Sequence, residues 1–132
     1  MTSALQPASV VIPLYNKEAE IGRALRSVLA QTVPPAAILV VDDGSTDGGP
    51  AAVRAFDDPR IRLIRQENAG PSSARNRGIA ESPTDLVALL DADDRWQPAF
   101  LQTVLELQRR HPEAGLWGTG FSFVDSTDGR EV

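Results

Sequence analysis

An apolar run that ends in a cluster of acids constrains this sequence more than any other feature. Leu86 to Leu90 is continuously apolar, and Asp91, Asp93 and Asp94 follow directly. A short, fully apolar run is typical of a strand buried on both faces, as in a parallel sheet covered by helices. Because unpaired carboxylates are unfavourable inside a buried strand, we expect them to lie where the strand reaches the surface. In open α/β folds that edge of the sheet binds ligands.

Two interpretations of Asp91, Asp93 and Asp94 are open from these residues alone. Clustered carboxylates repel one another unless a cation neutralises them, and hard divalent cations take oxygen ligands. The cluster is therefore either an Asp-x-Asp site that holds a diphosphate through Mg²⁺ or Mn²⁺, or a solvated acidic turn that caps the next helix.

Composition narrows the class of protein. The 132 residues carry a net charge of −5, which argues against nucleic acid as the main partner. The chain has no cysteine, so disulfides, thiolate metal sites and cysteine nucleophiles are excluded. No apolar run approaches the roughly 18 residues of a membrane-spanning helix, and the start does not resemble a signal peptide. We therefore expect a cytoplasmic protein, at most peripheral to the inner face of the membrane.

Strand-like and helix-like patterns alternate along the chain. We expect strands at residues 9–13, 38–41, 60–65, 86–90 and 116–124. Helices are expected after Asn16, near Gly48, at Pro71 and at Pro98, and residues 1–8 are expected to form a flexible lead-in. The order βαβαβαβαβ predicts an α/β fold of one domain over residues 1–132, a mostly parallel sheet with helices on both faces.

Polar side chains follow three of the expected strands. The first strand is followed by Pro13, Tyr15 and Asn16, the second by Asp42, Asp43 and Ser45, and the fourth by the three aspartates. These sets should share one edge of a parallel sheet, and crowded carboxylates cost several kcal/mol unless they are paired. Their recurrence predicts a ligand with hydroxyls, a base edge and a metal-bridged phosphate. Plainer roles are also open: Asn16 as cap of the next helix, Glu18 as a charge in its first turn, and Asp42 as a turn former.

Four segments, in order, resemble the motifs of family 2 glycosyltransferases. They are VVIPLYNKE at 10–18, VDDGSTD at 41–47, NAGPSSARNRG at 68–78 and LDADD at 90–94. Their order and spacing carry the resemblance, which covers roughly residues 9–124. It implies a Rossmann-like GT-A fold and a hexosyltransferase-type enzyme of polysaccharide or cell-envelope synthesis. It also implies a nucleotide-sugar donor, most often a UDP-sugar, a divalent cation, and inversion at the anomeric carbon.

The resemblance implies roles for individual residues. Those expected to bind the nucleotide sugar are Pro13, Tyr15, Asn16, Glu18, Asp43, Arg75, Asp91 and Asp93. Tyr15 would stack near the uracil beside Pro13, and Asp43 would accept a hydrogen bond from the uracil N3–H. Arg75 would approach the base or the diphosphate with its planar fork, whereas Arg77 is expected on a solvated helix face.

The metal is expected to be Mn²⁺ or Mg²⁺. Asp93 would bind it, with Asp94 as the second metal ligand, and Asp91 or Asp94 would assist or hold the ribose. The metal would offset the charge that develops on the leaving UDP.

In this family the catalytic base is a carboxylate from a later segment, which also builds most of the acceptor site. Asp125 and Asp128 have the surroundings of a plain hairpin turn, and His111 lies at a helix end before a proline, so the catalytic residue is unknown. We therefore expect the donor-binding half of an enzyme that uses a carbohydrate or lipid-linked acceptor, with the acceptor-binding half absent. We hypothesise that the apolar surface left uncovered drives homodimer formation, and that membrane association requires the absent parts.

Three alternatives were weighed against this resemblance. A response-regulator receiver has its acidic pair after the first strand and a lysine after the fifth, but here the pair follows the second strand and no lysine follows Lys17. A sugar-nucleotide nucleotidyltransferase opens with a glycine-rich loop, but residues 13–16 contain no glycine. A nucleotide-binding module without catalytic activity stays open, and sugar transfer, as opposed to binding alone, would separate it from an enzyme.

Overall fold

The computed structural model describes residues 4–124, 127 and 130–131. Over these residues strands and helices alternate: β1 (Ala8–Leu14), α1 (Ile21–Leu29), β2 (Ala37–Asp42), α2 (Gly49–Arg54), β3 (Ile61–Arg65), α3 (Pro71–Glu81), β4 (Leu86–Leu89) and α4 (Phe100–Arg110). The strands form one sheet in the order β3-β2-β1-β4, and every neighbouring pair is parallel. The predicted α/β class and the order of these eight elements are confirmed.

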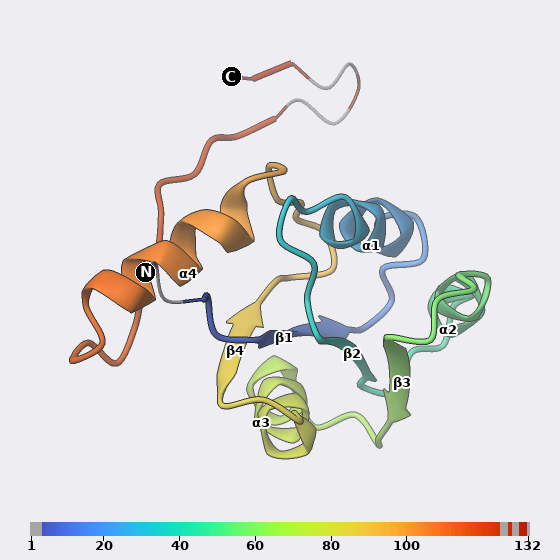
Figure 1. The fold of residues 1–132 in the computed structure, drawn as a ribbon. Coiled ribbons are helices and arrows are strands. Elements are labelled where there is room, and N and C mark those ends of the chain that lie inside the picture. Colours follow the sequence, from blue (N-terminus) through green and yellow to red (C-terminus); the bar gives the residue numbers. More distant parts are fainter. Residues whose placement is uncertain (1–3, 125–126, 128–129, 132) are drawn as a thin grey trace.

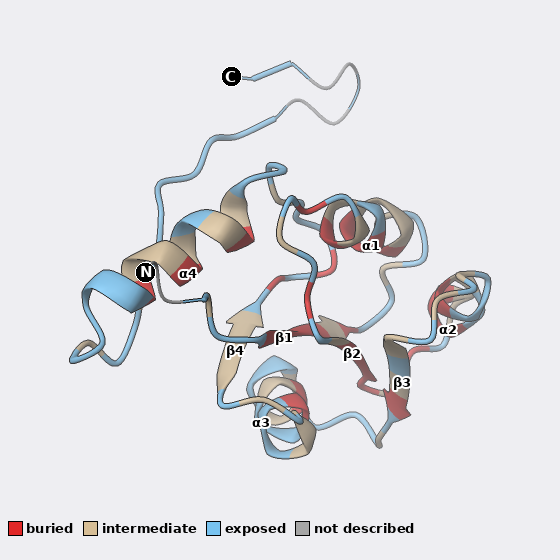
Figure 2. Ribbon diagram, in the orientation of Figure 1, coloured by how far each residue is buried: buried red, intermediate tan, exposed pale blue. Residues whose placement is uncertain are grey.

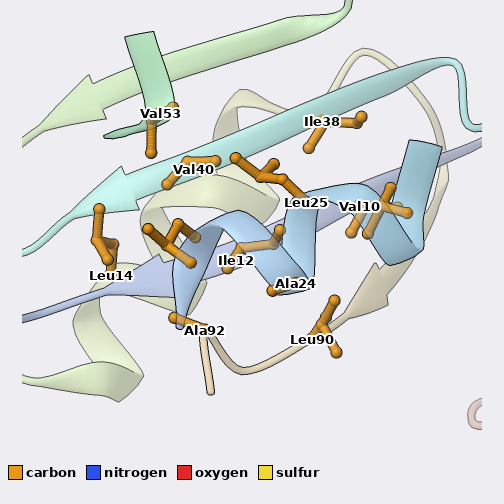
Figure 3. Close-up of a cluster of buried hydrophobic side chains, with 12 residues drawn as sticks. Val10, Ile12, Leu14, Ala24, Leu25, Ile38, Val40, Val53, Leu90 and Ala92 are labelled. Carbon is orange, nitrogen blue, oxygen red and sulfur yellow. The ribbon is translucent and has the colours of Figure 1, made fainter. Parts of the chain in front are cut away.

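Helices cover both faces of the sheet, as expected. In Figure 1, α1, α2 and α4 lie on one side of the strands and α3 lies on the other. Figure 2 shows that burial is concentrated in β1 and β2 and on the helix faces turned toward them. The largest core cluster lies between these two strands and α1, where Leu25 packs among Ile12 and Val40 (Figure 3).

The register of the sheet brings three loops to one edge. Leu14 lies opposite Asp42 at the ends of β1 and β2, and the Leu90 amide beyond β4 donates to the Val11 carbonyl. Because all strands run in the same direction, the segments after β1, β2 and β4 emerge together at the carboxyl edge. The polar residues singled out from the sequence follow these three strands.

Helix α3 approaches the sheet closely through a glycine. Gly78 is buried, and a Cβ atom placed on it would collide with the Val11 side chain of β1. The absence of a side chain therefore allows the helix backbone to pack directly against the strand.

We expect Gly78→Ala to destabilise the fold by about 1–3 kcal/mol, because the added methyl overpacks the contact with Val11. Urea denaturation would measure the loss. Gly22→Ala is the matched control, since the nearest neighbour of its Cβ is the flexible end of Arg26, 3.2 Å away. That change should be neutral or stabilising, because alanine has the higher helix propensity. Equal effects of the two substitutions would contradict the proposed contact.

The predicted fifth strand does not form. Residues 116–124 are irregular, apart from an isolated antiparallel bridge between Val124 and Glu131, and Leu116, Phe121 and Phe123 are exposed. Their composition suits a strand, but among the described residues they pair with no strand of the sheet, and an unpaired segment does not form a strand. Asp125 and Asp128 lie outside the described residues.

Strand β4 is also less buried than predicted. Its residues are half-buried and Leu89 is 47% exposed, because β4 is an edge strand of the described sheet and pairs there only with β1. The expectation of a strand buried on both faces is fulfilled instead by β1 and β2.

Pro13 does not end the first strand, which continues to Leu14. Along a strand, the backbone N–H and C=O groups of successive residues point alternately to the two neighbouring strands. The Val11 carbonyl points toward β4 and the Leu14 carbonyl toward β2, so the backbone of Pro13 points toward β4. The register pairs with β4 end at Val11 and Leu89, so no backbone N–H is needed at Pro13.

A smaller difference concerns the start of the chain. Ala8, placed in the lead-in, is a buried first residue of β1, and Leu5 packs partly buried beside it. Among the described helices, none has both the length and the apolar character needed to cross a membrane.

Candidate functional site

The acidic segment after β4 presents its carboxylates outward. Leu90 and Ala92 are buried in the core cluster that includes α1 (Figure 3). Asp91, Asp93 and Asp94 are exposed. One oxygen from each carboxylate lies within 4.8 Å of the others, and the Asp94 amide closes the turn by donating to the Asp91 carbonyl at 3.0 Å. The alternation of apolar and acidic residues therefore anchors the turn and clusters its charges.

Three basic residues from other elements meet this cluster. Lys17 Nζ, from the loop after β1, lies 3.3 Å from Asp93 Oδ2, and Arg75 Nη2 of α3 lies 2.9 Å from Asp91 Oδ1. Arg23 of α1 donates to the Asp93 carbonyl at 3.0 Å. Arg75 was predicted from the sequence as a site residue, whereas Lys17 and Arg23 were not. Only their contacts across the chain, not a local pattern, reveal these two.

The surroundings of Asp94 raise the pKa of its carboxyl above the ordinary value. Partial removal of the carboxyl from water is the largest cause, and the negative charges of Asp93 and Asp91 add to it. Arg23 opposes the shift in pKa only in part. A cation placed among the three carboxylates would relieve the repulsion between them.

The donor set fits a hard divalent cation. The three clustered groups offer carboxylate oxygens only, which Mg²⁺ and Mn²⁺ accept readily and which softer metals do not select. Carboxylate clusters of this kind also occur without any metal, so the fit is one of chemistry and spacing.

Asn16 joins the loop after β1 to the loop after β2. Its backbone N–H donates to Ser45 Oγ at 3.1 Å, and its side-chain Oδ1 accepts from the backbone N–H of Thr46 at 2.8 Å. Asn16 adopts a positive φ of 50°, which asparagine tolerates better than most residues. It does not cap α1, whose N-cap position is Glu20.

Glu18 makes a second connection between the same loops. Its amide donates to Asp47 Oδ2 at 3.0 Å, and its Oε2 accepts from the Gly48 amide at 3.2 Å. Gly48 is the N-cap residue of α2. Glu18 therefore precedes α1, outside its first turn, and its charge lies at the start of α2, where the helix dipole favours an anion.

Asp43 is the most completely bonded carboxylate of the site. It is 2% exposed, and it accepts hydrogen bonds from Gln66 Nε2 at 2.9 Å and from the amides of Ala69 and Gly70 at 2.8 and 3.0 Å. Asn68 Nδ2 lies 3.4 Å from its second oxygen. Burial alone would raise the pKa of Asp43, but these hydrogen bonds outweigh burial and hold the pKa below its ordinary value.

Asp42 has the plainer of its two predicted roles. It is fully buried, and its Oδ1 accepts from the Ser45 amide at 3.0 Å, which forms the turn after β2. Its Oδ2 accepts no hydrogen bond from the described residues, although Arg65 Nε lies 3.6 Å away.

The remaining selected residues lie at or near the carboxyl edge. Tyr15 follows β1 directly and is 47% exposed. Pro13 is half-buried within β1. Arg77 pairs with Glu81 one turn further along α3, at 2.6 Å, on the solvated face that was predicted for it.

Comparison with known proteins agrees with this geometry. The model of the family described as Glycosyl transferase family 2 matches residues 9–131. The chain belongs to glycosyl transferase family 2. A relative within the family is the succinoglycan biosynthesis protein ExoO of Rhizobium meliloti, which is 43% identical over 97 residues, or 73% of this chain and 28% of ExoO.

Two solved structures of similar fold carry ligands. TarS 1-349 of S. aureus in complex with UDP-GlcNAc has a TM-score of 0.74 at 27% identity over 80% of this chain and 32% of the TarS chain. Mannosyltransferase PcManGT of Pyrobaculum calidifontis, in complex with GDP-Man and Mn²⁺, has a TM-score of 0.73 at 27% identity over 80% of this chain and 33% of its own. The parallel four-stranded sheet with its helices is therefore a GT-A-like fold, as the family resemblance predicted.

The curated relatives that this chain matches are much longer than it is. The chain spans about a third of the length of the curated relatives it matches.

Proposed function

We propose that the chain forms the donor-binding part of a glycosyltransferase that uses a UDP-sugar. The observation that carries this proposal is the convergence of Asp91, Asp93 and Asp94 with two cationic side chains, Lys17 and Arg75, at one edge of the sheet. Family membership and two similar structures with bound nucleotide sugars support it. The sugar would pass to a carbohydrate or lipid-linked acceptor hydroxyl, with inversion at the anomeric carbon.

The nucleotide would lie over the loops after β1 and β2. Tyr15, exposed at the end of β1, would stack on the base beside Pro13. Asn16 and Glu18 hold the two loops together and would shape the wall of the pocket. Asp43 already accepts four contacts from residues 66–70, so a uracil N3–H would replace the longest of them, from Asn68 at 3.4 Å.

The diphosphate would lie near the acidic turn. Asp93 and Asp94 would hold Mn²⁺ or Mg²⁺, Asp91 would assist them, and Arg75 would turn its guanidinium from Asp91 to a phosphate oxygen. The cation, when bound, would neutralise charge on the leaving nucleotide. None of the described residues is assigned the deprotonation of the acceptor hydroxyl.

Calorimetric titration with UDP, with and without Mn²⁺, tests the proposal. We expect Mn²⁺ to increase the affinity for UDP, and we expect Asp93→Asn to abolish that increase, because an amide is a poor ligand compared with a carboxylate. Asp85→Asn is the matched control, since Asp85 is an exposed carboxylate at the opposite end of β4.

The results separate the alternatives. An increase that survives in Asp93→Asn, or that is lost equally in Asp85→Asn, would contradict the metal site. Absence of UDP binding in both conditions would contradict a donor site in this chain. Release of sugar from a UDP-sugar in the presence of an acceptor would distinguish an enzyme from a binding module.

A further inference from the structure

Lys17 is the only lysine in the sequence, and the other twelve basic residues are arginines. It lies in the loop after β1, where its carbonyl accepts from the Ile21 amide at the start of α1. Its neighbours Asn16 and Glu18 fix the loop to the segment after β2. The backbone of Lys17 is therefore held in place while its side chain reaches across to Asp93.

The pair between Lys17 and Asp93 is easily exchanged. Nζ and Oδ2 are 3.3 Å apart, and the two side chains are 42% and 48% exposed. Pairs with this exposure are weak, because water and salt screen them. A lysine ammonium is a compact charge on a flexible stem. Its ion pair depends less on a fixed geometry than a bidentate arginine pair does, so the side chain can leave Asp93 for another anion more easily.

Two other contacts hold the acidic turn in place when the pair breaks. Arg23 donates to the Asp93 carbonyl, and the Leu90 amide donates to β1, and neither contact involves the Asp93 carboxylate. Asp93 can therefore exchange its cation without displacement of its backbone.

We propose that Lys17 occupies the place of the divalent cation on Asp93 in the ligand-free protein and moves to the donor diphosphate when the metal binds. This inference rests on the proposed function. In the ligand-free state, Lys17 and Arg75 already neutralise two of the three carboxylates, so a divalent ion alone competes with both. A diphosphate provides new partners for the displaced cations, so metal and nucleotide bind more tightly together than separately.

Opposite effects of one substitution test this exchange. In Lys17→Gln, Mn²⁺ alone should bind about two- to fivefold more tightly, because the competing cation is gone. UDP at saturating Mn²⁺ should bind about tenfold more weakly, because a charged partner of the phosphates is gone. Electron paramagnetic resonance of free Mn²⁺ measures the first affinity, and calorimetry measures the second.

Two further variants serve as controls. Lys17→Arg keeps the charge and should leave Mn²⁺ alone as weakly bound as in the unchanged protein. Arg62→Gln removes a comparable exposed pair with Glu81, distant from the acidic turn, and should change neither affinity. Thermal melting of each variant would confirm that it is folded.

Parallel changes in both affinities of Lys17→Gln, or no change in either, would overturn the exchange while leaving the donor site intact. If the unchanged chain fails to bind UDP with Mn²⁺, the proposed function fails, and the exchange fails with it. Tighter Mn²⁺ binding together with weaker UDP binding supports the exchange, because a merely structural role of Lys17 would move both in the same direction.

Discussion

Asp43→Asn is expected to lower the free energy of unfolding by about 3–5 kcal/mol. The carboxylate is buried and serves as acceptor for the Ala69 and Gly70 amides and for Gln66. An asparagine side chain removes the charge and presents an NH₂ donor toward groups that are themselves donors. Breaking a buried charged group's hydrogen bonds costs this order of free energy, because the partners stay desolvated.

Urea denaturation at several pH values would measure the Asp43 effect. The pKa of Asp43 is lowered in the folded state, so its contribution is complete above the unfolded pKa, near 4, and is lost as pH falls through the folded pKa. The difference between the unchanged protein and Asp43→Asn should therefore be full at pH 7 and shrink below about pH 4. Asp57→Asn, at an exposed position, is the control and should show little difference at any pH. A pH-independent gap would refute the assigned cause.

Gln31→Ala is expected to destabilise the chain by about 1–3 kcal/mol. Gln31 is buried after α1, where Nε2 donates to the carbonyls of Ser27 and Gln97 and Oε1 accepts from the Leu101 amide. Alanine would leave the Leu101 amide, at the start of α4, without its acceptor, whereas the Gln97 carbonyl would keep its hydrogen bond from the Phe100 amide. A buried group left unsatisfied costs about 1–3 kcal/mol.

The loss in Gln31→Ala should be visible as a lower melting temperature of the protein, followed by far-ultraviolet circular dichroism. Gln102→Ala is the matched control, because Gln102 also bridges two elements by bonding to Thr32 but is only half-buried. We expect a cost of less than about 1 kcal/mol there. Equal losses at both positions would show that Gln31 does not anchor α4.

The order of the elements and the shared edge were predictable because they depend on local patterns. The apolar runs of β1 and β2 and the acids that follow β2 and β4 are visible without any three-dimensional information. Parallel alternation then places the strand ends together. Asp91, Asp93 and Asp94 could therefore be selected as one cluster from the sequence.

Contacts between loops were not predictable in the same way. Asn16 and Glu18 each have a local pattern of helix-start residues, yet both bond to the loop after β2, about thirty positions away. Lys17 and Asp93 are further apart still in the sequence. Where a side chain could bond either within its own segment or to a distant loop, the tertiary structure decides between them. Local sequence propensity holds no information about that structure.

The prediction of a strand at residues 116–124 was wrong for a related reason. Propensity describes how well a residue suits a pleated surface, but a strand also requires a neighbour that satisfies its backbone. The same limit explains why Leu89 is exposed although its segment is fully apolar.

The strand pairing that supports the candidate site is longer on the β2 side than on the β4 side, so the β4 side is expected to be the more flexible. Register pairs between β1 and β2 extend from Ser9 to Leu14, whereas those between β1 and β4 end at Val11. Amide hydrogens in the central strands should exchange with solvent only through global unfolding, and those of β4 through smaller local openings. A ligand that contacts both the acidic turn and the loops after β1 and β2 would stabilise the closed form and suppress those openings. Its binding would therefore slow hydrogen exchange along β4.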